Sequence, residues 1–215
     1  MNEQVRQHAS SLVSVDVLGL RLQQDGERVQ LLAHERPSEP FAGSLALPGV
    51  LLGRGERITE AAIRALRKAG LEERDVLGIG QLVTFDEPNR DPRGPTLSIA
   101  VWAGIRADAH ILETAQWVDI DAPPQLAFDH NRIVLDAQPL LARMLWDDLN
   151  FTRALTGPTF PVRAAVRITA SLTGREPNRG NLNRRLAALE GLEQVDGKTA
   201  PSHTGRPGAV WAWTD

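Results

Sequence analysis

The pattern of apolar residues changes near residue 150, and this change limits the possible folds more than any other feature of the 215-residue chain. Before it, short runs alternate between apolar and polar residues, as in strands that bury one face. We expect strands at 13–22, 29–32, 76–84, 97–105 and 116–120, and an amphipathic helix between Thr59, its N-cap, and Gly70. Strands and helices in this order predict a layered α/β domain with a mixed sheet over residues 1–150.

A longer helix is expected from Asp129 toward Trp146, with Pro139 predicting a kink or a restart within it. We interpret Asp129-His130 as the start of this helix rather than as an acid–base pair, because no nucleophile accompanies it. Trp146 is expected either in the core or at an interface between the two parts of the chain.

Residues 151–215 follow a different pattern. An amphipathic helix at 162–172 is separated by a polar turn from a second helix at 181–189, and strands are expected near Val195 and at 209–213. Helix, tight turn, helix and hairpin in this order predict a small winged-helix domain over residues 151–215.

Charge is also divided unevenly. Residues 151–215 hold nine Arg or Lys and five Asp or Glu, whereas residues 1–150 hold fifteen basic and twenty-two acidic residues. A cationic tail on an anionic body is typical of an appended nucleic-acid-binding module, although chance also produces an excess of this size.

Composition excludes several classes of protein. The chain is 42% hydrophobic and 24% charged, which is typical of globular proteins, and it has no cysteine, which excludes disulfide scaffolds, thiolate zinc sites and cysteine catalysis. Apolar runs such as 99–102 are far shorter than the roughly 20 residues of a membrane helix, and the N-terminus shows no secretion signal. We therefore expect a soluble, cytoplasmic protein without a membrane partner.

The segment from Gly49 to Leu71 resembles the Nudix box, the loop–helix signature of enzymes that hydrolyse nucleoside diphosphates linked to another moiety. Glu56, Arg64 and the closing Gly70-Leu71 follow that pattern. Ala65 departs from it by replacing a Glu, and Lys68 and Ala69 stand where a Glu pair belongs, one residue short. The leading Gly is also displaced, because Val50 is in register and Gly49 lies beside it. Mg²⁺ needs hard oxygen ligands, and this helix does not supply them. We expect no metal site and no catalytic residue.

A second motif lies at Arg90-Asp91-Pro92-Arg93-Gly94. Asp91-Pro92 predicts a turn, and the guanidinium groups of Arg90 and Arg93 at its two sides are expected to converge on a pyrophosphate. The predicted ligand-binding residues are Arg90, Asp91, Arg93, Glu56 and Arg64.

The broken box, this turn and the tail together resemble the Nudix-related transcriptional regulators of NAD metabolism over nearly the whole chain. The resemblance implies a Nudix-like α/β/α sandwich followed by a winged helix, and a homodimer that binds operators of NAD biosynthesis or salvage genes. It also implies a non-hydrolytic protein that requires no cofactor and senses ADP-ribose, with NAD as the alternative. Some regulators of this architecture control sugar catabolism instead.

The second helix of the tail is the expected DNA reader, because in helix–turn–helix proteins this helix enters the major groove. Leu182, Leu186 and Leu189 recur on one face and are expected to pack inward. The predicted DNA-binding residues are Arg179, Asn181, Asn183, Arg184 and Arg185 on the helix, and Lys198 and Arg206 in the wing.

Two hypotheses follow from the sequence. The first is a repressor with a non-hydrolytic sensor domain. The alternative is an active Nudix-type hydrolase whose metal ligands lie outside the box and whose tail serves dimerisation. The missing Glu pair favours the first.

Overall fold

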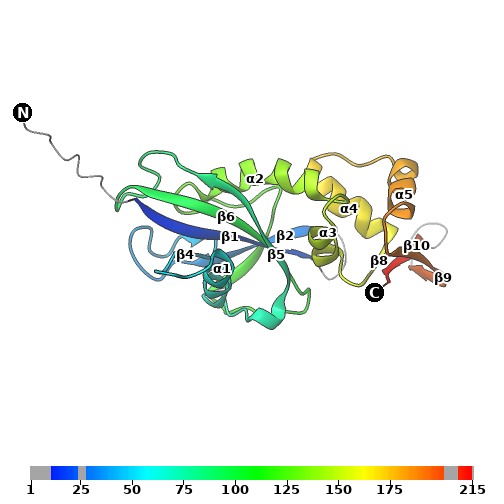
Figure 1. The fold of residues 1–215 in the computed structure, drawn as a ribbon, viewed down its shortest axis with the longest axis horizontal. Coiled ribbons are helices and arrows are strands. Elements are labelled where there is room, and N and C mark those ends of the chain that lie inside the picture. The colour runs from blue at the N-terminus through cyan, green and yellow to red at the C-terminus, as the bar shows by residue number, and fades with distance from the viewer. Residues whose placement is uncertain (1–10, 24–27, 201–207, 215) are drawn as a thin grey trace, which may run out of the picture.

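The computed structural model describes residues 11–23, 28–200 and 208–214, and Figure 1 shows how their helices and strands are arranged. The first part of the chain forms β1 (Leu12–Leu22), β2 (Val29–Glu35), β3 (Leu45–Ala46), β4 (Gly49–Leu51), α1 (Ile58–Arg67), the short 3-10 helix η1 (Glu73–Asp75), β5 (Val76–Phe85), β6 (Thr96–Ile105), β7 (Ala115–Asp119), α2 (His130–Met144) and α3 (Leu149–Thr156). The remaining elements are β8 (Thr159–Pro161), α4 (Val162–Thr173), α5 (Arg179–Ala187), β9 (Leu192–Ala200) and β10 (Gly208–Trp213).

The larger sheet is mixed, as the sequence predicts. Its strand order is β3-β2-β1-β6-β5, with β4 paired to β1 and β7 paired to β2. The pair of β1 and β6 is parallel and runs from Leu12 opposite Thr96 to Leu20 opposite Gly104, whereas β1 with β2 and β5 with β6 are antiparallel.

Side chains of β1 alternate between two cores, because successive residues of a strand point to opposite faces of the sheet. Val15 and Val17 pack against α1, where Leu66 is buried. Leu18 and Leu20 point to the other face and join the core that includes residues of α2 and α3. Figure 1 shows α1 and α2 on opposite sides of the sheet. The sheet between these helices gives the predicted α/β/α sandwich.

Helix α3 lies directly on β6. The rings of Trp102 and Phe151 meet edge to face with centroids 5.1 Å apart. A Cβ atom on Gly104 would lie 2.5 Å from the Cβ atom of Ala154, so only glycine allows this close approach. The boundary predicted after residue 150 therefore falls inside a helix that packs on the sheet.

The last elements form a second, smaller assembly at one end of the molecule (Figure 1). Strands β8, β10 and β9 make an antiparallel three-stranded sheet, and α4 and α5 are joined by a turn. Gly174 ends α4 in the left-handed conformation, with φ of 69°. Helix α5 begins two residues before the predicted start, because the Asn178 side chain caps it by accepting a hydrogen bond from the N–H of Asn181.

The two assemblies share packed surfaces. Gln138 of α2 donates a hydrogen bond to the carbonyl of Ser171 in α4, and the Trp146 indole N–H donates to the Thr169 hydroxyl at 3.1 Å. One hydrophobic cluster extends without interruption from Leu18 in β1 to Trp211 in β10. Trp146 therefore lies in the core and at the contact between the two parts.

One local expectation was wrong. Arg57 rather than Thr59 occupies the N-cap of α1, because the Glu60 carboxylate accepts a hydrogen bond from the backbone N–H of Arg57. Helix α2 runs through Pro139 without a restart and ends at Met144, shortly before Trp146, whereas the alternative of a kink at Pro139 stays a prediction. Pro139 and Leu135, whose carbonyl would lose a donor to proline, are both exposed, so water can replace the missing bond.

In the described parts of the chain, no helix is long and apolar enough to cross a membrane.

Candidate functional site

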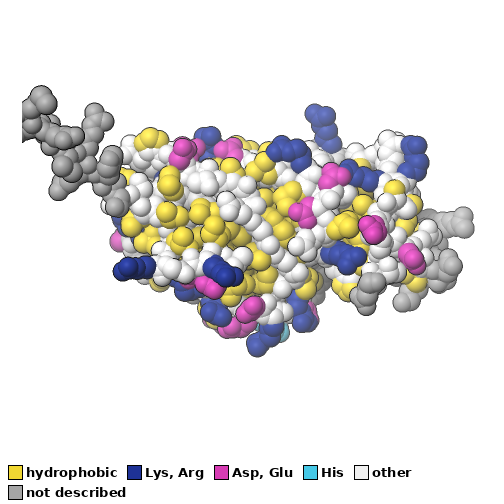
Figure 2. Space-filling model, viewed as in Figure 1, with side chains coloured by type: hydrophobic (Ala, Val, Ile, Leu, Met, Phe, Trp, Pro, Cys, Tyr) yellow, Lys and Arg dark blue, Asp and Glu magenta, His cyan; other side chains and the backbone are white. Residues whose placement is uncertain are grey.

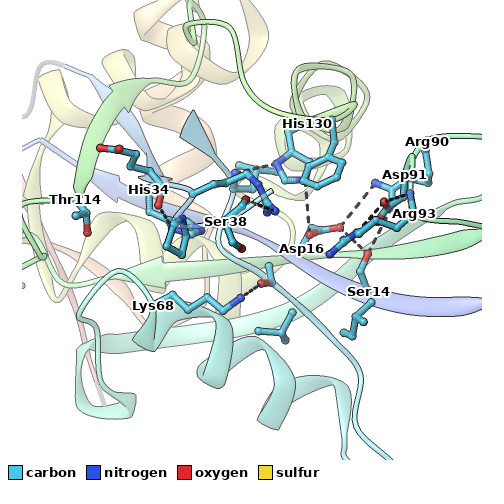
Figure 3. Close-up of a pocket in the computed structure, with 18 residues that line it drawn as sticks. Ser14, Asp16, His34, Ser38, Lys68, Arg90, Asp91, Arg93, Thr114 and His130 are labelled. Atoms are coloured by element: carbon cyan, nitrogen blue, oxygen red, sulfur yellow. Dashed lines mark hydrogen bonds and ion pairs between the residues drawn. The ribbon is translucent and has the colours of Figure 1, made fainter. Parts of the chain in front are cut away.

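A cavity of about 530 Å³ opens beside the large sheet, a size that suits a small-molecule ligand. Figure 3 shows the side chains that line it. They come from β1, β2, β4, the C-terminal end of α1, the turn before β6 and the start of α2. The lining includes Ser14, Asp16, His34, Arg36, Gly49, Lys68, Arg90, Asp91, Arg93, Thr114, Phe128 and His130.

Asp16 is a buried carboxylate on the α2 face of β1, with 5% of its surface exposed. The hydroxyl of Ser98 donates to it at 2.5 Å and that of Ser14 at 2.9 Å. The guanidinium of Arg90 and the Nε2 atom of His130 each lie 3.8 Å from it (Figure 3). A buried charge is costly without such partners, which explains why strands β1 and β6 and helix α2 all supply one.

Arg90 connects the turn before β6 to the start of α2. Its guanidinium donates two hydrogen bonds to the Asp129 carboxylate, at 2.7 and 2.9 Å, and only 4% of its side chain is exposed. Asp129 therefore holds the N-cap position of α2 while its side chain binds Arg90 instead of capping the helix. Arg90 and Arg93 both line the cavity, and Asp129 accepts from two of the five guanidinium donors of Arg90, so the convergence of the two arginines on one ligand stays a prediction.

His130 is a neutral imidazole in this structure. Its Nδ1 atom accepts a hydrogen bond from the backbone N–H of Leu47 at 2.9 Å, which places the ring proton on Nε2. Burial lowers the pKa of His130, and the nearby Arg90 adds to this effect, whereas Asp16 opposes it. The ring therefore fixes the start of α2 against the strand region at Leu47.

Arg93, Arg36 and Phe128 form an aromatic and cationic wall of the cavity. The Arg36 guanidinium lies 4.6 Å from the centre of the Phe128 ring and that of Arg93 lies 5.7 Å from it. Arg93 also makes a close ion pair with Asp91, at 2.7 Å. Phe128 adopts a positive φ of 55°, a strained conformation for a bulky residue that is often associated with ligand sites.

Two cations of the cavity have no carboxylate partner in the described residues, Arg36 and Lys68. Arg36 donates to the backbone carbonyls of Pro40 and Ser38, and Lys68 Nζ donates to the carbonyl of Gly49 at 2.7 Å. Desolvation lowers the pKa of both groups, and Arg93 lowers that of Arg36 further, while Arg36 lowers that of Lys68. This mutual repulsion favours an anionic ligand at the cavity.

Glu56 and Arg64, both predicted to bind the ligand, are not among the residues that line the cavity. They bind each other through two hydrogen bonds of 2.8 and 2.7 Å, and Arg64 also donates to the carbonyl of Leu51. Arg64 and the N–H of Gly53 lower the pKa of Glu56 to about 2. The pair therefore fixes the loop before α1.

Helix α1 does not fit a divalent metal ion. Ala65 and Ala69 are fully buried in the core, Lys68 brings a positive charge, and both oxygens of Glu56 are already hydrogen-bonded. The described residues contain no group of three Asp, Glu, His or Cys side chains that could hold a metal. The donor set that Mg²⁺ requires is therefore missing from this helix.

Helix α5 presents the predicted DNA-binding side chains to solvent, while Leu182 and Leu186 are buried as expected. Figure 2 shows basic side chains, in dark blue, projecting at the end of the molecule that holds α5. Asn183 is exposed. Arg179 pairs with Glu176, Arg184 bonds to Asn181, and Arg185 makes an ion pair of 2.6 Å with Asp147, beyond the end of α2. Arg206 and the side chain of Lys198 lie outside the described part of the structure.

Several residues of the cavity were missed from the sequence: Asp16, His34, Arg36, Phe128 and, as a ligand-binding group, Lys68. Asp16 gave no signal, since it stands at a polar position of the alternation of Val13, Val15 and Val17, where an exposed side chain is expected. The others lie at the end of a strand, a helix or a loop, where no periodic pattern identifies them.

The comparison with known sequences is limited to part of the chain. No protein-family model matches it. An ADP-ribose pyrophosphatase of Methanocaldococcus jannaschii is 33% identical over 114 residues, which is 50% of this chain and 64% of that protein. The match thus spans less than two thirds of this curated relative.

Solved structures are similar over most of the chain. Shewanella oneidensis NrtR in complex with a 27mer DNA has a TM-score of 0.74 at 20% identity, and 94% of this chain and 93% of that chain are covered. A MutT/nudix family protein from Enterococcus faecalis has a TM-score of 0.72 at 20% identity, with 97% and 90% covered. The NUDIX domain of the Shewanella protein complexed with ADP ribose has a TM-score of 0.50 at 22% identity and covers 65% of this chain and 94% of that one. With TM-scores of 0.72 and 0.74 at 20% identity, the likeness shows the fold alone: the chain has the Nudix fold.

Proposed function

We propose that this protein is a DNA-binding transcriptional repressor whose Nudix domain binds ADP-ribose, or a related NAD metabolite, without hydrolysing it. Its operators would control NAD biosynthesis or salvage genes, and it would act as a homodimer. In this proposal the elements that follow α3, from β8 to β10, form a winged helix, with α5 as the reading helix and β9 and β10 as the wing.

The single observation that carries the proposal is that a cavity with two cations lacking carboxylate partners in the described residues lies beside a helix α1 that lacks metal ligands. Arg36 and Lys68 line the cavity, while Ala65 and Ala69 replace carboxylates beside it. Such a cavity is suited to holding a pyrophosphate rather than cleaving it. The ADP-ribose in the structure of the Shewanella NUDIX domain supports this choice of nucleotide.

Support for DNA binding comes from α4 and α5 with the turn between them. In helix–turn–helix proteins the second helix enters the major groove with its N-terminal residues toward the bases. Here Asn181, Asn183 and Arg184 are exposed at that end of α5, and Arg and Asn are side chains that read guanine and adenine or hold phosphates. The DNA complex of the Shewanella protein supports the same assignment.

Helix α2 connects the cavity to the region of α5. At its start His130 lines the cavity and Asp129 binds Arg90, and just beyond its end Asp147 binds Arg185 of α5. A ligand changes DNA affinity only if it binds the DNA-competent and incompetent arrangements differently. A typical coupling of about 1–3 kcal/mol would change DNA affinity roughly 5–150-fold.

Fluorescence anisotropy with promoter fragments of the source organism's NAD-synthesis genes tests the proposal. We expect binding that ADP-ribose weakens within that range, and an Arg184→Ala variant that binds about tenfold or more weakly. Arg106→Ala, an exposed change beside β6 far along the chain from α5, is the control and should bind like the wild type. Equal binding by wild type and Arg184→Ala would contradict the assignment of α5.

An active hydrolase remains the second candidate, because the relative from Methanocaldococcus jannaschii is an ADP-ribose pyrophosphatase. The two candidates differ in one measurement. AMP released from ADP-ribose above a no-enzyme control, and abolished by a chelator, would replace the repressor proposal with the enzyme.

A further inference from the structure

Lys68 lies at the C-terminal end of α1, beside the cavity. It follows the last residue of α1 as the C-cap, and its ammonium group reaches across to the carbonyl of Gly49 at the edge of the cavity (Figure 3). In the box pattern this is a position where a metal-binding carboxylate belongs. Lys68 thus places a positive charge where a carboxylate of the box pattern would place a negative charge that binds a metal ion.

The surroundings of Lys68 favour an anion. An ammonium group has three donors, and the carbonyl of Gly49 accepts one of them. Arg36, Arg64 and Arg93 all repel the charge of Lys68, whereas the carboxylate of Asp16 favours it. Two N–H groups are then available to a ligand, and a pyrophosphate would relieve the repulsion among these cations.

We propose that the Lys68 ammonium holds the pyrophosphate of the bound nucleotide in place of a divalent metal ion, so that nucleotide binding requires no metal. This inference rests on the proposed function and names the group that makes it possible. An ammonium neutralises phosphate oxygens through charge-assisted hydrogen bonds. Unlike a metal ion, it does not coordinate water or lower the pKa of that water, so binding is separated from hydrolysis.

Calorimetric titration of the full chain with ADP-ribose tests the inference, first in a chelator and then in Mg²⁺. We expect the same dissociation constant in both. Lys68→Met keeps the length of the side chain and removes its charge, so affinity should fall about tenfold or more. Lys68→Arg restores a cation and should recover most of the affinity.

Arg67→Met is the matched control, because it removes one positive charge from the neighbouring position of the same helix. Arg67 pairs with Glu72 and is not among the residues that line the cavity. Its affinity for ADP-ribose should equal that of the wild type. Thermal melting of each variant by circular dichroism checks that it is folded, and the comparison of chelator with Mg²⁺ on the wild type needs no variant.

The outcomes separate this inference from the function on which it rests. Binding that requires Mg²⁺, or a folded Lys68→Met variant that binds like the wild type in chelator, overturns the role of Lys68 and leaves a nucleotide-binding repressor intact. No binding of ADP-ribose or NAD by the wild type in either condition overturns both.

Discussion

Two regions of the same cavity differ in how their charged side chains are paired. Around Asp16, the charged groups of Arg90 and Asp129 lie within ion-pair distance of an opposite charge. Arg36 and Lys68, in contrast, are held by backbone carbonyls and have no carboxylate partner in the described residues. The first region is a closed network between a strand, a turn and a helix, and the second offers its charge to the cavity.

This difference separates structural charges from binding charges. Residues of the first region should affect folding when changed, because their partners are buried with them. Residues of the second should affect ligand affinity and have little effect on folding, because only carbonyl contacts are lost. Arg90 and Arg36 represent the two regions. The ion pair of Glu56 with Arg64 lies outside the cavity and serves as a third case.

The largest effect is expected for Arg90→Ala. Removing this guanidinium leaves the carboxylates of Asp129 and Asp16 without their cation, so the free energy of unfolding should fall by about 3 kcal/mol. Urea denaturation at neutral pH measures it. Arg106→Ala breaks an ion pair with Asp108 whose two side chains are 48% and 66% exposed, and its effect on the free energy of unfolding should be far smaller, because solvent screens exposed charges. Similar losses for the two variants would show that Arg90 is not part of a closed network.

An intermediate effect is expected for Arg36→Ala. Its guanidinium faces the Phe128 ring and the cavity, so ADP-ribose should bind about tenfold more weakly, with a loss of roughly 1.5 kcal/mol. Calorimetric titration gives this value, and urea denaturation should show nearly unchanged stability. Arg132→Ala, on the exposed side of α2, is the matched control. A variant of Arg36 that unfolds easily but binds normally would reverse the comparison.

The smallest effect is expected for Glu56→Gln, and it depends on pH. Because Arg64 lowers the pKa of Glu56 from 4.5 to about 2, the pair contributes stability above pH 4.5 and loses it as the pH falls toward 2. The melting temperature of wild type should exceed that of the variant slightly at pH 7, and the difference should shrink below pH 4.5. Calorimetric scans of both proteins from pH 7 to pH 2 check this. A difference that stays constant to pH 2 would assign it to another cause.

The fold was predictable because its signals are local. The alternation of Val13, Val15 and Val17 marks β1, and the order of strands and helices then predicts the layers. Helix ends were less predictable, as at Asn178 and Arg57, because a cap depends on the geometry of single side chains.

The site was predictable only in part, because its contacts join distant residues. Arg93 and Asp91 line the cavity as expected from their motif. Asp129, however, is 39 residues from Arg90 and accepts two of its hydrogen bonds, and the partners of Asp16 include residues of β6 and α2. No spacing in the sequence indicates which of two arginines in a turn will meet a carboxylate from another element.

Because one hydrophobic core joins the two parts of the molecule, neither part is an independent module. Regulators joined by a flexible tether can exchange one sensor for another, because each half folds without the other. Here Trp146, Phe151 and Trp211 belong to one hydrophobic cluster, so a cut after residue 150 would expose apolar surface on both pieces. Under the proposed function, a change of effector is therefore expected to arise by substitution of residues that line the cavity, and not by joining the C-terminal elements to a new sensor domain.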